Sequence, residues 1–442
     1  MTTAAPTKRA RTRDALLVAL QELLLDPDIA SVSVPLVVGR AGAAQGTFYN
    51  YFESLPEAID AVGALVLAEH TRVLQLVTSG AADTAEIVAR SARQTLMLLA
   101  HRADAGQLLF DSGLPVEEAI AEWPVKVDRT GLPPFFDPAV LLAGFRRLTA
   151  DHCRRGIPRE VTQATLRDLD LWMDHHWAAT GAWAVRETGW IARHFTSRVF
   201  QIGRLQFEPQ VFDLPFAVFA TRRGTAAAIL AEGGRVFRAD GQFADADAGV
   251  TGSADAQSTW TSRFVEDEHG SRGSAVDAAG RVQPTPVALD GGAWDRAARR
   301  GDAVLAVHIP AAGRFNGPMA REACADSFRR AIPFFAKHLP RFQPRLLTCE
   351  SWMLDPQLAP YLPPESNLVS FQQFFRPVPV PGASDRQALE RVFGGPVADW
   401  SKAPRDTSLR RIMAEQAERG IRWRMGAGVM LPADAGGAAL TR

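Results

Sequence analysis

The stretch "AVLAVHIPAAGRFNGPM", from Ala303 to Met319, sets a strand, a loop and the start of a helix in order. Its first eight residues, apolar except for His308, form a run typical of a buried strand. A glycine-bearing loop follows, and the helical pattern "AREACADSFRRAIPFF" starts at Ala320. A loop that leads into a helix in this way can hold a pyrophosphate on free backbone N–H groups. The stretch therefore predicts an α/β domain with a phosphate-binding turn.

Strand patterns surround this stretch throughout the second half of the chain. They are "VFDLPFAVFAT", "AAAILAEGG", "RVFRADGQF", "STWTSRFVED", "PTPVALD", "RLLTCESWML", "NLVSFQQFF" and "IRWRMGAGVML". Gly233 and Gly234 predict a hairpin turn between the second and third of these strands. Helical patterns lie at Ala320 to Lys337 and Thr407 to Arg419. We therefore predict a mixed α/β domain with a largely antiparallel sheet.

Motifs for several reaction classes are missing from the sequence. It has no G-x-S-x-G elbow, no G-x-x-x-x-G-K loop and no G-x-G-x-x-G, so hydride transfer and nucleotide hydrolysis have no local support. Four histidines lie in the middle of the chain, and their spacing matches no known metal-binding motif: His152, His175, His176 and His194. We expect them to be packing or surface residues, and we predict no metal site.

Further stretches resemble the GNAT-like C-terminal domain of bacterial acyltransferases. They are "GRLQFE" (Gly203 to Glu208), "AVHIP", "CESWMLDPQL", "ESNLVSFQQFF", "RDTSLRR" and the helical lead-in "RRGIPREVTQATLRDLDLW". The resemblance covers about residues 132 to 432. It implies a fold that binds acyl-CoA and can pass the acyl group to an amine. It also implies that Arg314 and Gly317 belong to the loop that holds the acyl-CoA pyrophosphate, although Met319 occupies the last small position of that loop.

Acylation of an amine needs a base for the ammonium proton, and often an acid for the departing thiolate. His308, at the end of its strand, is the best candidate for the base. Glu350 and Asp355 follow, and Tyr361 is the only tyrosine in this half of the chain. The alternative is structural: His308 would cap the strand, and Asp355 would cap the turn before Pro356.

The N-terminal segment places two of the three tyrosines in the heptapeptide "GTFYNYF", Gly46 to Phe52. The leucine-rich helix "TRDALLVALQELLLDP" precedes it, then a short helix opened by Ser33 and Pro35 and ended by Gly42. "AAQGTFYNYF" predicts a helix of about two turns, and "SLPE" is a capping box that opens a longer helix. Two short helices joined by a glycine turn predict a helix-turn-helix.

Within the heptapeptide, Phe48 and Phe52 are four residues apart and should face inward, which leaves the tyrosines free to contact a DNA backbone. The segment "SVPLVVGRAGAAQGTFYNYFESLPEAI" resembles the DNA-binding segment of TetR-type transcriptional regulators, over about residues 10 to 70. This second resemblance implies DNA contacts. They would come from Ser33, Gln45, Thr47, Tyr49, Asn50 and Tyr51, with help from a basic arm that carries Lys8, Arg9, Arg11 and Arg13.

Composition limits these interpretations. The 442 residues carry 49 basic and 49 acidic side chains, so any DNA contact must be local. Three scattered cysteines argue against a disulfide framework and for a reducing cytoplasm. We see no apolar run approaching a membrane span and no secretory leader, so we expect a cytoplasmic protein that does not contact a membrane.

Two functional interpretations follow. The first is a TetR-type regulator, a homodimer on a double-stranded DNA operator, whose C-terminal domain binds an acyl-CoA or related acyl metabolite. The alternative is an N-acyltransferase whose N-terminal helices serve docking or dimerisation. We expect a multidomain chain in which an all-α part precedes the α/β domain. Its parts are a disordered basic arm (1–9), a helix-turn-helix (10–55), a helical regulatory or dimer region (56–130), a helical lead-in (131–200) and a GNAT-like domain (201–435).

Overall fold

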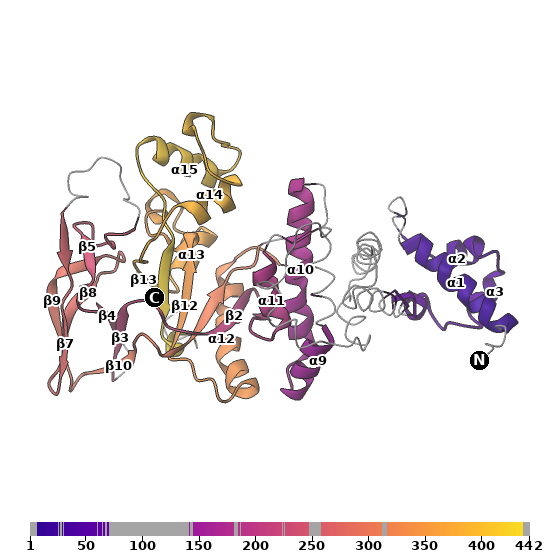
Figure 1. Ribbon diagram of the computed structural model, residues 1–442, viewed down its shortest axis with the longest axis horizontal. Helices are drawn as coiled ribbons and strands as arrows, with labels where there is room; N and C mark the ends of the chain where they lie inside the picture. Colours follow the sequence, from indigo (N-terminus) through magenta and orange to yellow (C-terminus); the bar gives the residue numbers. More distant parts are fainter. Residues whose placement is uncertain are drawn as a thin grey trace, which may run out of the picture. The chain divides into compact units, whose positions relative to one another are not determined.

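The computed structural model divides the chain into two compact units, Met1–Phe200 and Gln201–Arg442 (Figure 1). It describes residues 7–24, 26, 29, 31–59, 61–63, 65–66, 69, 141, 145–180, 184–185, 187–222, 224, 226–246, 258–311 and 316–435. Most of the predicted regulatory or dimer region, 56–130, lies outside these residues. Among the described helices, none has the length and apolar character that a membrane crossing requires.

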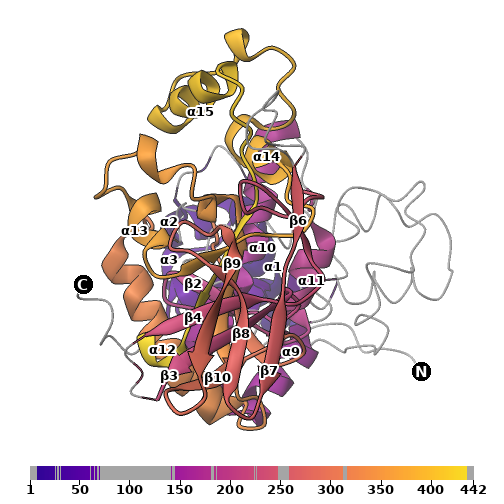
Figure 2. The same cartoon turned by 90° about the vertical axis from the view of Figure 1, so that its left-hand side faces the viewer.

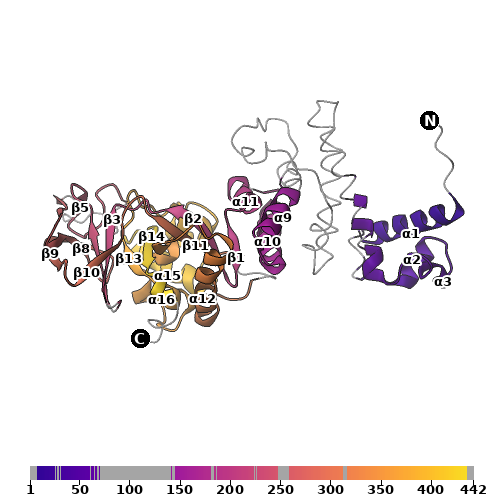
Figure 3. The ribbon, with the colours of Figure 1, turned by 90° about the horizontal axis from the view of Figure 1, so that it is seen from below.

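Three helices open the first unit: α1 (Lys8–Leu24), α2 (Val34–Arg40) and α3 (Gln45–Phe48) (Figure 3). Lys8 and Arg9, which we expected in a disordered arm, belong to the first turn of α1. The predicted leucine face of α1 is buried: Leu16, Leu17, Leu20, Leu23 and Leu24. Pro35 lies in the first turn of α2, where its missing N–H costs little, and Gly42 ends the segment at a φ of 64°.

Three further helices close the first unit: α9 (Phe145–Arg154), α10 (Arg159–Thr180) and α11 (Thr188–Phe195). His152 and His194 are buried among them. His152 Nδ1 lies 2.8 Å from the hydroxyl of Thr162, and His194 Nε2 lies 3.3 Å from a carboxylate oxygen of Asp168. Burial lowers the pKa of His152 to about 4. Within the described ranges, no group of His, Cys, Asp and Glu side chains could hold a metal ion.

The second unit is built on a six-stranded sheet in the order β1-β2-β11-β12-β14-β13. Its strands are β1 (Phe200–Ile202), β2 (Leu205–Val211), β11 (Ala303–His308), β12 (Leu346–Ser351), β14 (Gly426–Met430) and β13 (Arg376–Val378). β11 and β12 are parallel, whereas the pairs β2/β11, β12/β14 and β13/β14 are antiparallel. α12 (Arg321–His338) connects the parallel pair and covers one face of the sheet, where Phe328 packs edge-on against Phe207 of β2.

A second sheet packs against the other face of this first sheet (Figure 2). Its path is β10-β3-β4-β8-β7, with β9 also paired to β8. Its strands are β3 (Phe216–Thr221), β4 (Ala227–Ala231), β7 (Phe264–Asp267), β8 (Gly270–Val276), β9 (Val282–Asp290) and β10 (Trp294–Ala298). A two-stranded ribbon, β5 (Val236–Arg238) and β6 (Thr259–Thr261), lies beside it. The shared core joins Phe216 and Phe237 to Val304 and Leu346 of the first sheet.

Short helices follow the strands of the first sheet: η3 (Trp352–Leu354), η4 (Ala359–Tyr361), α13 (Asn367–Gln372), α14 (Arg386–Phe393), η5 (Trp400–Lys402), α15 (Ser408–Glu418) and α16 (Pro432–Ala435). Two local predictions fail here and in the second sheet. "NLVSFQQFF" is helical because the Ser366 hydroxyl accepts a hydrogen bond from the Val369 N–H and caps α13. Gly233 and Gly234 connect β4 to β5 and form no hairpin, because these strands pair with other partners. The mixed, mostly antiparallel character of the domain is confirmed.

Candidate active site

The parallel strands β11 and β12 part at their carboxyl ends. Their registered pairs run from Val304 and Leu346 to Ala306 and Thr348, and then stop. Beyond this point each strand stays paired only with its neighbour on the other side. β11 pairs with β2 as far as His308 and Gln206, and β12 pairs with β14 as far as Ser351 and Gly426. The two strands therefore separate from each other at their carboxyl ends, where His308 lies.

Polar side chains share one face of the sheet at this opening. The register places Gln206 opposite His308 and Glu208 opposite Ala306, and residues two apart on a strand lie on the same face. The pairing of Ala306 with Thr348 puts Glu350 of β12 on that face as well. α12 covers the opposite, apolar face. The second sheet packs on the same face as these polar side chains but farther back along the strands, at Val304 and Leu346, so a reaction can be arranged at the opening itself.

Glu208 and His308 form a pair at the centre of this face. Glu208 is completely buried, and one of its carboxylate oxygens lies 3.2 Å from His308 Nε2. The same oxygen accepts a hydrogen bond of 2.7 Å from the side-chain amide of Gln210. The His308 side chain is 26% exposed. A carboxylate at one ring nitrogen fixes the orientation of an imidazole, so Glu208 directs the other nitrogen, Nδ1, to the far side of the ring.

Gln206 is a buried amide beside this pair. It is 1% exposed, and neither the oxygen nor the nitrogen of its side chain has a hydrogen-bond partner among the described residues. Buried amide groups are normally paired, because an unmade hydrogen bond in the interior costs free energy. Gln206 therefore offers both a donor and an acceptor next to His308.

Glu350 contributes a second carboxyl group at the opening. Desolvation by the surrounding protein raises the pKa of Glu350, although the residue as a whole is exposed. The negative charge of Asp213 acts in the same direction, and His308 opposes both. A carboxyl group with a raised pKa can keep a proton to higher pH and can donate it. Glu350 and His308 thus suit opposite halves of a proton exchange.

The other predicted residues of this half lie in different surroundings. Asp355 is buried and its carboxylate accepts hydrogen bonds from the backbone N–H groups of Gln357 and Arg424, at 3.0 and 2.8 Å. Burial raises the pKa of Asp355, with Arg424 opposing. Tyr361 packs its ring edge-on against Trp423. The sequence-based alternative, in which Asp355 caps a turn, describes these contacts.

The predicted pyrophosphate loop is described only at its end. Arg314 lies outside the described residues, whereas Gly317 is described and its carbonyl accepts a hydrogen bond of 2.9 Å from Arg204 Nε. Arg204 is 8% exposed, and burial lowers its pKa. The nearby Cys324 thiol has its pKa raised to about 11 by burial, so it is not a thiolate near neutral pH. Arg204 therefore holds the backbone that leads into α12.

The predicted DNA-contact residues lie in the first unit. Phe48 and Phe52 are buried, as their spacing predicts. Tyr49 is 58% exposed, whereas Tyr51 is half-buried with the Arg9 guanidinium 6.0 Å from its ring centre. The remaining members lie on α1, α2 and α3 or beside them: Arg11, Ser33, Gln45, Thr47 and Asn50. The Ser33 side chain makes no capping hydrogen bond.

Sequence reasoning missed Glu208 and Gln206. Both lie in "GRLQFE", where polar Gln206 and Glu208 alternate with apolar Leu205 and Phe207. Such alternation ordinarily indicates a strand with a solvated polar face. The site could have been identified only from the pairing of this strand with the strand of His308, and that pairing cannot be read from the sequence.

Two family models match the chain. The model described as N-acyltransferase N-terminal domain matches residues 67–197, and the one described as GNAT-like C-terminal domain matches residues 199–430. No curated protein matches. Among solved structures, an acyltransferase mutant in complex with octanoyl-CoA is similar at 21% identity, over 78% of this chain and 87% of that one, with a TM-score of 0.45. An acyltransferase in complex with decanoyl-CoA and teicoplanin is similar at 20% identity, over 96% of this chain and 99% of that one, with a TM-score of 0.46.

The prediction of a TetR-type regulator is wrong. Both matching models are acyltransferase models, and the first begins at residue 67, inside the region where we expected a regulator's helices. The helix-turn-helix pattern misled because spacing of apolar residues and a glycine turn specify how short helices pack and not what they bind. The matched GNAT-like model covers more than half of the residues. The chain therefore belongs to the family of proteins with a GNAT-like C-terminal domain.

Proposed function

We propose that this protein is an N-acyltransferase that moves an acyl group from an acyl-CoA to an amine. The observation that carries the proposal is the pair of Glu208 and His308 at the opening between β11 and β12. The family models support it, because both are acyltransferase models. A homodimer and a cytoplasmic location stay predictions.

The residues at the opening fit the thioester end of an acyl-CoA, which is the acyl donor. Separated strands expose backbone groups that a pantetheine arm can pair with, and Gln206 supplies buried amide atoms for a carbonyl oxygen or an amine hydrogen. At the other end, Gly317 lies just before α12, whose N-cap residue Ala320 provides no side-chain hydrogen bond. The first N–H groups of α12 therefore suit a phosphate. The sequence-based assignment of Arg314 to this function is part of the proposal.

An acyl-CoA supplies the thioester carbonyl carbon to which the amine nitrogen adds as the carbon–sulfur bond breaks. His308 takes the proton that the attacking amine loses, and Glu208 stabilises the imidazolium that results. Glu350 returns a proton to the departing sulfur. Gln206 donates an N–H to the carbonyl oxygen while negative charge develops there. Asp355 and Tyr361, also predicted as catalytic, contribute through the packing of the surrounding loops.

Thiol release from acyl-CoAs of several chain lengths, measured with a panel of amines, tests the proposal. We expect release that depends on the amine and an N-acyl product of matching mass. His308→Gln should abolish most of this release, while His269→Gln, a change at an exposed turn, should not. Absence of any acylated amine across the panel, from protein that is folded by circular dichroism, would remove the proposal.

A further inference from the structure

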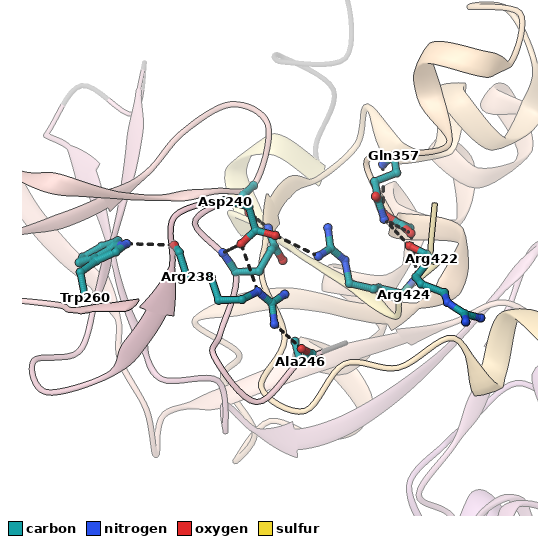
Figure 4. Close-up of polar contacts among 10 residues, drawn as sticks. Arg238, Asp240, Ala246, Trp260, Gln357, Arg422 and Arg424 are labelled. Atoms are coloured by element: carbon teal, nitrogen blue, oxygen red, sulfur yellow. Dashed lines mark hydrogen bonds and ion pairs between the residues drawn. The ribbon is translucent and has the colours of Figure 1, made fainter. Parts of the chain in front are cut away.

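Arg204 is a buried arginine in the turn between β1 and β2, and it has no carboxylate partner among the described residues. The other two buried arginines of the described second unit do have one: Arg238 and Arg424 lie 3.6 and 3.5 Å from the two carboxylate oxygens of Asp240 (Figure 4). Among the described groups, only the Cys324 thiol interacts electrostatically with Arg204, and burial raises the pKa of that thiol to about 11. Because arginine stays protonated in proteins, Arg204 carries a buried positive charge that the described residues do not neutralise.

The guanidinium group of Arg204 also has an N–H donor that the described residues do not use. Nε donates to the carbonyl of Gly317 at 2.9 Å, whereas Nη1 is buried and has no hydrogen-bond partner in the described part of the chain. Only 8% of the residue is exposed to solvent. A buried guanidinium group costs free energy unless its charge is paired and its donors are used. An anion that reaches Nη1 would remove both parts of this cost.

The unused donor lies beside the amino end of α12. Gly317, which accepts from Arg204, precedes the N-cap residue Ala320 by three positions, and Ala320 provides no side-chain hydrogen bond. The first intrahelical bond runs from the Cys324 N–H to the Ala320 carbonyl, which leaves the N–H groups of residues 321 to 323 without an intrahelical acceptor. The aligned peptides of this 18-residue helix add positive potential at the same end. Arg204 and α12 therefore both favour an anion at this end of the helix.

The carboxylates near this end of α12 do not take the place of such an anion. The stretch from Ala311 to Met319 contains no acidic residue. Glu322, in the first turn of α12, is exposed and forms no ion pair with Arg204. Asp326 is already paired, with Arg330 at 3.3 Å. A counter-charge for Arg204 must therefore come from a ligand.

The turn that carries Arg204 is fixed against α12. The backbone N–H of Arg204 donates to the Ser327 hydroxyl at 2.8 Å, and this hydroxyl donates in turn to the carbonyl of Ala323 at 2.9 Å. Gly203 has a φ of 64°, and a Cβ at this position would lie 2.7 Å from Ser327 Oγ, so only glycine lets the turn approach the helix this closely. Because its turn is already fixed, Arg204 loses little conformational entropy when a ligand binds.

Resting on the proposed acyl transfer, we infer that Arg204 binds the diphosphate of the acyl-CoA and so selects donors that carry phosphate on the pantetheine arm. A charged N–H donor and free helix N–H groups match the charge and the acceptor oxygens of a diphosphate. The connection from β11 to α12 joins His308, at the thioester end, to Gly317, so the phosphates attached to the pantetheine arm are the ones that reach this end of α12. The 3′-phosphate of CoA offers the same chemistry and is the other source that the experiment separates.

Isothermal titration calorimetry with CoA, dephospho-CoA and pantetheine tests the assignment without turnover. Dephospho-CoA keeps the diphosphate and lacks the 3′-phosphate, and pantetheine lacks both. Wild type should bind both nucleotides more tightly than pantetheine. Arg204→Met should raise the Kd for CoA and for dephospho-CoA roughly 10- to 100-fold, the range for a lost hydrogen bond to a charged group, and leave the Kd for pantetheine unchanged. Arg204→Lys, which keeps the charge, should fall between.

Arg330→Met is the matched control, because it removes an exposed arginine near the same turn that is already paired with Asp326, and it should leave all three Kd values unchanged. Circular dichroism checks the fold of each variant.

An equal loss of pantetheine binding in Arg204→Met would show that Arg204 only supports the loop. A loss for CoA without one for dephospho-CoA would assign Arg204 to the 3′-phosphate and overturn the diphosphate assignment. Should wild type bind none of the three ligands, or bind pantetheine as tightly as dephospho-CoA, the inference fails whatever the variants do. Acyl transfer is measured separately, so a protein that acylates no amine but shows the expected Kd pattern would refute the proposed function and keep the role of Arg204.

Discussion

Glu208 and His308 lie on neighbouring antiparallel strands with a carboxylate oxygen 3.2 Å from the imidazole Nε2. The carboxylate is completely buried, and the imidazole is partly open to solvent. This relationship joins a buried carboxyl group to an imidazole that can accept a proton at the opening between β11 and β12. Four predictions follow from the residues around it.

Loss of the base should remove most of the activity. We expect His308→Gln to lower kcat by about 10²- to 10⁴-fold, the usual contribution of a general base. Glu208→Gln should have a smaller effect, because glutamine keeps a hydrogen bond to the ring and loses only the charge. Steady-state kinetics with a reactive acyl-CoA measures both. Equal activity of His308→Gln and wild type would exclude His308 as the base.

Replacement of Gln206 should separate activity from stability. Gln206→Leu removes from the interior two polar groups that have no hydrogen-bond partner among the described residues, so the melting temperature should stay equal or rise. The same change deletes the proposed donor to the carbonyl oxygen, and kcat should fall by about 10²- to 10³-fold. A loss of stability together with activity would show that Gln206 is a packing residue.

The Glu350→Gln variant should show a pH-dependent gain in stability. Because the pKa of Glu350 is raised in the folded protein, its contribution to stability is complete at low pH and is lost as pH rises through the raised pKa. Glutamine carries no such loss. The difference in melting temperature between variant and wild type should therefore grow as pH rises above the usual carboxyl pKa of about 4.3 and through the raised pKa of Glu350. Turnover should fall at every pH, and a variant of full activity would remove Glu350 as the acid.

Asp355→Asn should change stability more than catalysis. An asparagine amide presents an N–H where Asp355 now accepts from the Arg424 backbone, so a buried hydrogen bond is lost at a cost of about 1–3 kcal/mol. Urea unfolding measures this loss. If instead kcat falls while the unfolding midpoint is unchanged, Asp355 acts in the reaction as the sequence first suggested.

Local patterns predicted much of the framework. The apolar run ending at His308 forms β11, the pattern from Ala320 forms α12, and the leucine spacing of α1 is buried. These features depend on residues close in the chain, where period and capping decide the outcome. Where two local signals competed, as in "NLVSFQQFF", the serine cap of α13 prevailed over the aromatic and β-branched residues.

By itself the sequence determined that His308 ends a buried strand before a loop and a helix. Only the tertiary structure decided that Glu208 lies beside it, 100 residues earlier in the chain. The same holds for Arg238 and Arg424, which meet at Asp240 from opposite ends of the second unit. Strand order and register arise from contacts between distant segments, and no periodicity within one segment encodes which neighbour it will meet.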